Sequence, residues 1–157
     1  MKITRLIALA LCTACLSAYA QEAKLTDHVN PFIGSSNYGT TNPGALCPNG
    51  MMSVTPFNVM GSDLNRYDKD SRWWSTPYSS DNKYFTGFSH VNLSGVGCPE
   101  VGLALTMPTG GQLNVDYHVY GSEYHSEVAA PGYYGCELTS YGIKAEVSAT
   151  SRTSIER

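Results

Sequence analysis

The chain has 157 residues, with 10 lysines and arginines against 13 aspartates and glutamates, so its net charge is −3. This acidic balance argues against nucleic acid or an anionic membrane surface as a partner. Eleven tyrosines, 15 glycines and 8 prolines are typical of a β-rich protein. Tyrosines also suit a protein that stacks flat side chains on sugar rings, although tyrosines that fill sheet faces are the commoner explanation.

The N-terminal segment has the features of a secretory signal peptide. A basic segment, residues 1–5, precedes an apolar run over residues 6–16 that is too short to span a bilayer. A small-x-small triplet follows at residues 18–20, so we expect cleavage after Ala20 and export to the periplasm or the cell exterior.

Lipid attachment at Cys15 is the weaker alternative, because Cys12 rather than a leucine stands three residues before it. Cleavage after residue 20 would leave residues 21–157, with eight basic and 13 acidic residues and a net charge of −5. No other apolar run approaches membrane length, so we expect one modest domain without a membrane span.

Three cysteines remain after cleavage, namely Cys47, Cys98 and Cys136. No two of them have the C-x-x-C spacing of a metal or redox site. One disulfide with a spare thiol and three buried free thiols are both consistent with this pattern.

Short strands separated by turn signals are predicted along the mature chain. The first is "GMMSVTPF" (50–57), and residues 58–86 follow it as a long loop without any period. "VGLALTM" (101–107) is a uniformly apolar strand that Pro108 ends. "QLNVDYHVY" (112–120) alternates apolar and polar residues, as a half-buried strand does.

Two further strands are predicted near the end of the chain. A Pro131-Gly132 turn precedes a strand that places Tyr134, Cys136 and Leu138 on one face. "GIKAEVSATSR" (142–152) alternates again. These patterns predict an all-β, antiparallel β-sandwich. Because the chain stops just after a strand pattern, we also expect an unpaired edge and a truncated domain.

Motifs for catalysis or metal binding are few. The histidines have no metal-ligand spacing, and no P-loop, dinucleotide fingerprint, EF-hand loop or G-x-S-x-G motif is present. The acids available for a catalytic pair are Asp63, Asp68, Asp70, Asp81 and Glu100. These acids lie in surface-like loops, where solvated charges are commoner than a catalytic pair, so no particular pair is predicted to be catalytic.

Three segments mix aromatic or amide side chains with glycines. They are "NPFIG…NPGALCPNGMM", "RWWSTPY" and "GFSHVNLSGVG". Glycine permits close approach of the backbone, while Trp, His and Asn supply a stacking face and directional hydrogen bonds. This mixture favours a neutral polyol ligand.

Three ordered blocks carry a resemblance to a known family. They read "VNPFIGSSNYGTTNPGALCPNGMMSVTPF", "GFSHVNLSGVGCPEVGLALTMPT" and "SEVAAPGYYGCELTSYGIKAEVSATSR", and together they span about Val29 to Arg152. The chain resembles the N-terminal part of glycoside hydrolase family 92, the calcium-dependent exo-acting α-mannosidases.

The resemblance implies a β-sandwich domain that packs against a large helical toroid absent from this chain, with the active site between them. It implies hydrolysis of terminal mannose, often α-1,2-linked, from a mannose-containing glycan with inversion. The catalytic carboxylates and the Ca²⁺ ligands would come from the missing C-terminal catalytic domain, so this fragment alone would be inactive. Asn42, Asn49 and Asn92 depart from the family pattern and leave the linkage preference open.

Four residues are predicted to line the sugar-facing edge. They are Trp73, Trp74, His90 and Asn92. For His90, a buried histidine that bonds a glycine-rich turn is an equally good explanation. A freestanding carbohydrate-binding sandwich module and an adhesion sandwich without a sugar site are the alternatives to the enzyme domain.

Overall fold

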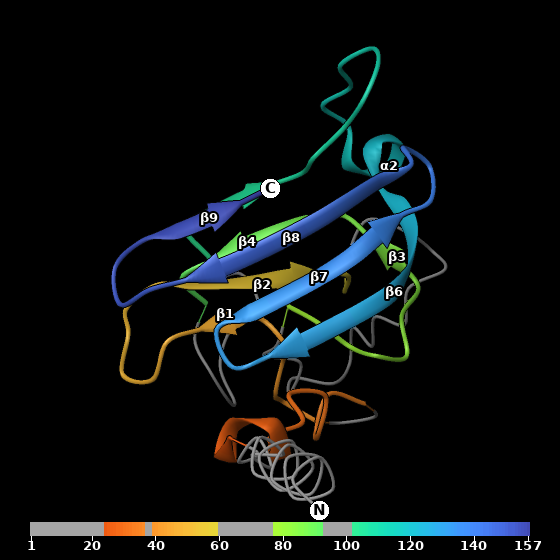
Figure 1. Ribbon diagram of the computed structural model, residues 1–157. Helices are drawn as coiled ribbons and strands as arrows, with labels where there is room; N and C mark the ends of the chain where they lie inside the picture. The colour runs from red at the N-terminus through yellow and green to blue at the C-terminus, as the bar shows by residue number, and fades with distance from the viewer. Residues whose placement is uncertain (1–23, 37–38, 60–76, 93–101) are drawn as a thin grey trace, which may run out of the picture.

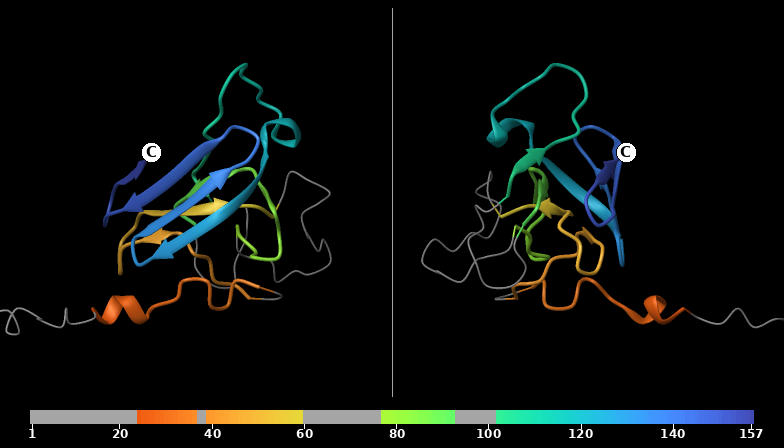
Figure 2. Two further views of the ribbon diagram at one scale, coloured as in Figure 1. Left: turned by 45° about the vertical axis from the view of Figure 1, so that its right-hand side comes forward. Right: turned by 90° about the vertical axis from the view of Figure 1, so that its left-hand side faces the viewer.

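The computed structural model describes residues 24–36, 39–59, 77–92 and 102–157, which form two antiparallel sheets packed face to face (Figures 1 and 2). The four-stranded sheet has the order β1 (Ala45–Leu46), β2 (Ser53–Phe57), β4 (Gly87–His90) and β5 (Ala104–Thr106). The five-stranded sheet has the order β3 (Tyr84–Phe85), β6 (Ser122–Ala130), β7 (Tyr133–Leu138), β8 (Ile143–Ala149) and β9 (Ser154–Glu156). The predicted all-β antiparallel sandwich is confirmed.

Two short helical segments accompany the sheets, the 3₁₀ turn η1 (Leu25–His28) and the single turn α2 (Tyr117–Tyr120). Among the described residues, no helix has the length and apolar character needed to cross a membrane.

The core lies between the sheets and is built around aromatic rings. Phe85 of β3 and Phe88 of β4 meet edge to face, with ring centroids 4.9 Å apart. Phe88 contacts Tyr134 of β7 at 6.2 Å, and Phe85 contacts Tyr124 of β6 at 5.7 Å. Aromatic pairs of this kind add to the free energy that burial of the rings supplies. The two edge-to-face pairs of Phe88, with Phe85 and with Tyr134, connect the two sheets.

The predicted pattern of β7 and β8 is confirmed. Tyr134, Cys136 and Leu138 are buried on one face of β7, opposite Ala145 and Val147 of β8. Cys136 is a free thiol whose pKa burial raises to about 12, so it packs as a small apolar group. Cys47 is also free, and Cys98 lies outside the described residues.

The strand predicted over residues 112–120 is wrong. Leu113, Val115 and Val119 are 77%, 83% and 58% exposed, and the segment ends in α2 instead. The Asn114 side chain accepts a hydrogen bond from the Asp116 backbone N–H at 2.8 Å. Asp116 in turn caps α2 by accepting from the His118 N–H at 3.0 Å. These local hydrogen bonds compete with those of a strand ladder, and here they favour a helical turn over a strand.

The predictions around β4 and β5 need adjustment. Among the described residues 102–107 of the apolar segment, Ala104–Thr106 form a strand, which lies exposed at a sheet edge. "GFSH", for which no strand is predicted above, forms β4, one of the two inner strands of this sheet. Within the segment predicted as a long loop, residues 84–85 form β3. Residues 60–76 of that loop lie outside the described part of the chain.

Candidate functional site

Two of the four predicted sugar-binding residues can be placed. Trp73 and Trp74 lie outside the described residues. His90 ends β4 and Asn92 follows it, while Val91 between them has φ +57°. A β-branched residue is rarely found in this left-handed region, and such strained positions cluster at functional sites. The strain therefore marks the end of β4 as a site candidate.

Asn92 and His90 lie on opposite faces of the four-stranded sheet. His90 pairs with Val54, a core residue, and so faces the five-stranded sheet. The Asn92 side chain accepts a hydrogen bond from the Ser89 hydroxyl at 3.0 Å, on the outer face. The two residues predicted to share one edge therefore do not converge on a single point.

Small polar residues make up the outer face around Asn92. Ser53, Thr55 and Ser89 are 9%, 1% and 5% exposed, and the Asn92 N–H donates to the Ser53 hydroxyl at 3.1 Å. Asn42 accepts from the Thr55 hydroxyl at 3.2 Å. We call this set of residues the hydroxyl face: Asn42, Ser53, Thr55, Ser89 and Asn92.

Two glycines allow other segments to approach the hydroxyl face closely. A Cβ atom on Gly44 would lie 2.5 Å from the Thr55 hydroxyl oxygen, and one on Gly102 would lie 2.5 Å from that of Ser89. The "NPGA" segment and the residues before β5 therefore contact the face through bare backbone. The separate glycine-containing sequence blocks thus meet at one place in the fold.

One polar atom of the hydroxyl face is buried without a partner. The Asn92 amide nitrogen Nδ2 has no hydrogen-bond acceptor in the described structure, although its Oδ1 is engaged. A buried amide without an acceptor costs about 1–3 kcal/mol relative to a paired one. Such atoms are uncommon in native proteins and call for a ligand, a water or another segment.

His90 is held by a carboxylate of β9. Its Nε2 lies 2.6 Å from the Glu156 Oε1, and its Nδ1 lies 3.3 Å from the Ala104 carbonyl oxygen. Both Glu156 oxygens also accept from the Thr106 hydroxyl at 2.9 Å. Because both partners of the ring are acceptors, both nitrogens donate only when the imidazole is protonated.

The His90 arrangement agrees with the explanation of a satisfied, hydrogen-bonded histidine. Its partners are Glu156 and the backbone of β5 rather than a glycine-rich turn. The His90 side chain is 14% exposed, and its contribution to sugar binding stays a prediction. Sequence reasoning missed Glu156 because no local pattern connects it with β4.

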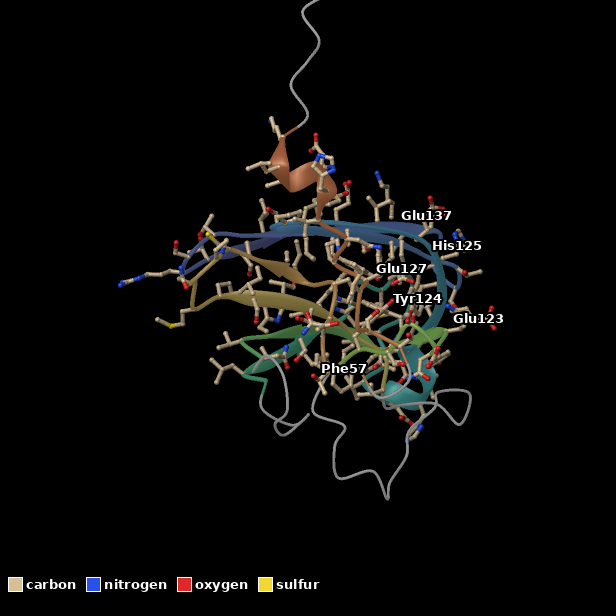
Figure 3. All side chains as sticks on the ribbon, turned by 90° about the horizontal axis from the view of Figure 1, so that it is seen from below. Phe57, Glu123, Tyr124, His125, Glu127 and Glu137 are labelled. Carbon is tan, nitrogen blue, oxygen red and sulfur yellow. The ribbon has the colours of Figure 1, made fainter. Side chains whose placement is uncertain are left out.

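A second carboxylate that accepts hydrogen bonds, Glu127, comes from β6. The pairing of β6 with β7 shifts between His125 and Val128, where Ser126 has φ +54°. This bulge adds one residue and turns Glu127 inward, whereas regular alternation would point it outward. Figure 3 shows Tyr124 and Glu127 between the sheets, and Glu123, His125 and Glu137 toward the outside.

Glu127 accepts hydrogen bonds from two buried tyrosines. The hydroxyls of Tyr78 and Tyr134 both donate to its Oε1 at 2.8 Å. Burial raises the pKa of both phenols, so they stay protonated donors. Glu127 and Tyr134 belong to the "EVAAPGYY" block. This contact gives that motif a structural role.

The comparisons with known proteins agree with this fold. A model of the glycosyl hydrolase family 92 N-terminal domain matches residues 28–157. The structure of a family GH92 α-mannosidase from Bacteroides thetaiotaomicron matches with TM-score 0.72 and 34% identity, over 85% of this chain and 18% of that one. Its complex with mannoimidazole matches with TM-score 0.72 and 32% identity, over the same shares of the two chains.

A more distant match has the same fold. An inverting family GH92 mannosidase from Bacteroides thetaiotaomicron VPI-5482 matches with TM-score 0.60 and 22% identity, over 86% of this chain and 18% of that one. A search among curated protein sequences gives no match. The chain therefore spans about a fifth of the length of the enzymes that it resembles.

Proposed function

Because this chain belongs to the glycosyl hydrolase family 92 N-terminal domain family, we propose that it forms the substrate-cleft domain of an α-mannosidase. The observation that carries the proposal is the match to a GH92 α-mannosidase, which was also solved with mannoimidazole bound. A mannose-containing glycan is the proposed substrate, and the domain would supply part of the wall of the cleft.

The hydroxyl face is the part of that wall for which the contacts argue most strongly. Asn92 presents a buried amide donor without an acceptor, and a sugar hydroxyl is an acceptor of suitable chemistry. Trp73 and Trp74 would stack on the sugar rings, as aromatic side chains do in carbohydrate sites. His90 would act indirectly, since Glu156 and the Ala104 carbonyl already engage its ring.

The catalytic carboxylates and a calcium site are proposed to lie elsewhere in the enzyme. The described residues contain no group of three or more His, Cys, Asp or Glu side chains that could hold a metal ion. These residues therefore do not fit a Ca²⁺ site. We propose that a helical catalytic domain outside this chain supplies both groups, and that the present fragment alone is inactive.

We further propose that the enzyme inverts the anomeric configuration, prefers α-1,2-linked mannose and is exported. One structure of the same fold is described as an inverting mannosidase, which supports inversion as the stereochemical outcome. The signal-like residues 1–20 support export to the periplasm or the cell exterior.

The test uses the full-length protein that carries this domain. Incubated with α-1,2-, α-1,3- and α-1,6-linked mannobiosides, it should release mannose fastest from the α-1,2 isomer. Proton NMR during the first turnovers should detect β-mannose, and chelation of calcium should abolish activity until calcium is restored. Retention on mannan without any release of mannose would instead favour a carbohydrate-binding module.

A further inference from the structure

A pocket of about 200 Å³ lies on the outer face of the five-stranded sheet. Tyr133 pairs with Ser148, and Ser148 pairs with Ile155, so these side chains share one face of β7, β8 and β9. Their neighbour Tyr134 points the other way, into the core. The pocket is thus separated from the sandwich interior by the sheet itself, whose outer face is turned toward the viewer in Figure 1.

Glu146 organises the polar side of this pocket. Its Oε1 accepts from the Tyr133 hydroxyl at 2.6 Å and lies 3.2 Å from the Lys144 Nζ. Its Oε2 accepts from the Arg157 Nε at 3.1 Å and from the Nη2 of the same guanidinium. The carboxylate therefore fixes a phenol, an ammonium and a guanidinium around one point.

Counting donors and acceptors shows what the pocket still offers. A carboxylate has about four lone-pair sites, and four donors already occupy those of Glu146. Arg157 has five N–H donors and Lys144 has three, and Glu146 is their partner in the described structure. Lys144 lies beside the pocket rather than in its lining, and Glu137 pairs with it across β7 and β8, so the pocket has surplus N–H donors, above all on the Arg157 guanidinium, rather than a net charge.

The other side of the pocket is apolar. Ile155 is 69% exposed there, beside the half-buried Tyr133. Pyranose rings present apolar C–H faces to such side chains, while their substituents reach polar groups at the rim. A free inorganic anion would use the cations but leave the apolar floor unused.

We propose that this outer-face pocket binds an acidic sugar residue, a pyranose that bears a carboxylate or a sulfate. The anionic group would lie against the free N–H groups of Arg157 and Lys144, and the ring would rest on Ile155 and Tyr133. Planar guanidinium groups favour such oxyanions through paired hydrogen bonds. This site is separate from the hydroxyl face and does not depend on mannosidase activity.

Calorimetric titration of the full-length protein tests the proposal with four probes: methyl glucuronide, glucose 6-sulfate, methyl glucoside and inorganic sulfate. We expect at least one of the two acidic sugars to bind about tenfold more tightly than methyl glucoside and than inorganic sulfate, as one added hydrogen bond to a charged group allows. Comparing the two acidic sugars identifies which anionic group the pocket prefers.

Substitutions inside and outside the pocket test whether the acidic sugar binds there. Arg157→Ala and Tyr133→Ala should each weaken binding of the tighter acidic sugar about tenfold or more, whereas Arg152→Ala, which removes an exposed arginine outside the pocket, should not. If Tyr133→Ala unfolds, Arg157→Ala and Arg152→Ala carry the comparison by themselves.

Three results would overturn the proposal: equal binding of methyl glucoside, equal binding of inorganic sulfate, or the same loss in Arg152→Ala. Release of mannose by the wild-type protein is measured separately, so failure of the mannosidase proposal is distinguished from failure of this site.

Discussion

Glu156 on the edge strand β9 contacts His90 on the central strand β4, with Glu156 Oε1 2.6 Å from His90 Nε2. The contact joins the two sheets along one side of the sandwich, because β9 belongs to one sheet and β4 to the other. Thr106 of β5 donates to the same carboxylate, so three strands share this polar connection.

Glu156→Ala should destabilise the domain by about 1–2 kcal/mol, because the His90 ring and the Thr106 hydroxyl lose the carboxylate that they share. Urea unfolding followed by tryptophan fluorescence measures the change. Glu123→Ala, at an exposed position of β6, is the matched control and should change the free energy of unfolding by less than about 0.5 kcal/mol. Equal effects of the two substitutions would contradict a role for the His90 contact.

Glu127→Ala should destabilise the domain more, by about 2–4 kcal/mol, because two buried tyrosine hydroxyls lose one shared acceptor. Glu127→Gln keeps an acceptor oxygen and should lose clearly less. Thermal unfolding of both variants and of the control Glu123→Ala ranks the three proteins by stability. A glutamine variant as unstable as the alanine variant would show that the hydroxyls do not depend on this acceptor.

The sequence predicts those parts of the fold in which burial alone determines the pattern. In β7 and β8 the alternating residues Tyr134, Cys136, Ala145 and Val147 face the core without interruption. β6 could not be predicted in this way, because the bulge at Ser126 reverses which residues face inward.

At residues 112–120 the sequence pattern predicts a strand that the structure does not contain. They alternate well, yet the side chains of Asn114 and Asp116 bond to nearby backbone and favour a helical turn. Periodicity measures amphipathic character, and it does not include such local hydrogen bonds.

For the candidate site, the sequence singles out segments but not the contacts that their residues make. Composition singled out the segments that contain Gly44 and Asn92, and the structure brings both residues to one face together with Gly102, which lies outside those segments. The partner of His90, Glu156, comes from a distant strand, and such a pairing depends on how the two sheets pack.

The stability contributed by Glu146 should depend on pH in the acidic range. Its hydrogen bond from Tyr133, together with Arg157 and Lys144, lowers the pKa of Glu146 from 4.5 to about 2. A carboxyl whose pKa is lower in the folded state stabilises the fold above the unfolded value, and this contribution disappears as pH falls through the folded value. The difference in urea midpoint between wild type and Glu146→Gln should be constant above about pH 5 and vanish near pH 2. A constant difference across that range would contradict the assignment.

Trp73 and Trp74 are predicted to stack on the sugar. In the full-length enzyme, Trp74→Ala should lower kcat/KM on a mannobioside by about 1–3 kcal/mol of transition-state binding, a typical loss of one aromatic contact in a sugar cleft. Trp73→Ala is measured beside it. Unchanged kinetics in both variants would remove the two tryptophans from the site.

Asn92 offers the sharpest test of the hydroxyl face, because one isosteric substitution removes its amide donor and keeps its acceptor oxygen. Asn92→Asp keeps the oxygen that accepts from Ser89 and removes the amide donor Nδ2, which has no acceptor within the described structure. If that donor contacts the sugar, Asn92→Asp in the full-length enzyme should lower kcat/KM about tenfold or more, the value of one hydrogen bond in a cleft. Thr55→Val, a similarly sized change in the same face, is the control for repacking, because the Thr55 hydroxyl is already bonded to Asn42. An aspartate variant with wild-type kcat/KM would show that the amide serves only the fold, and a loss shared by Thr55→Val would assign the effect to packing of the face rather than to the donor.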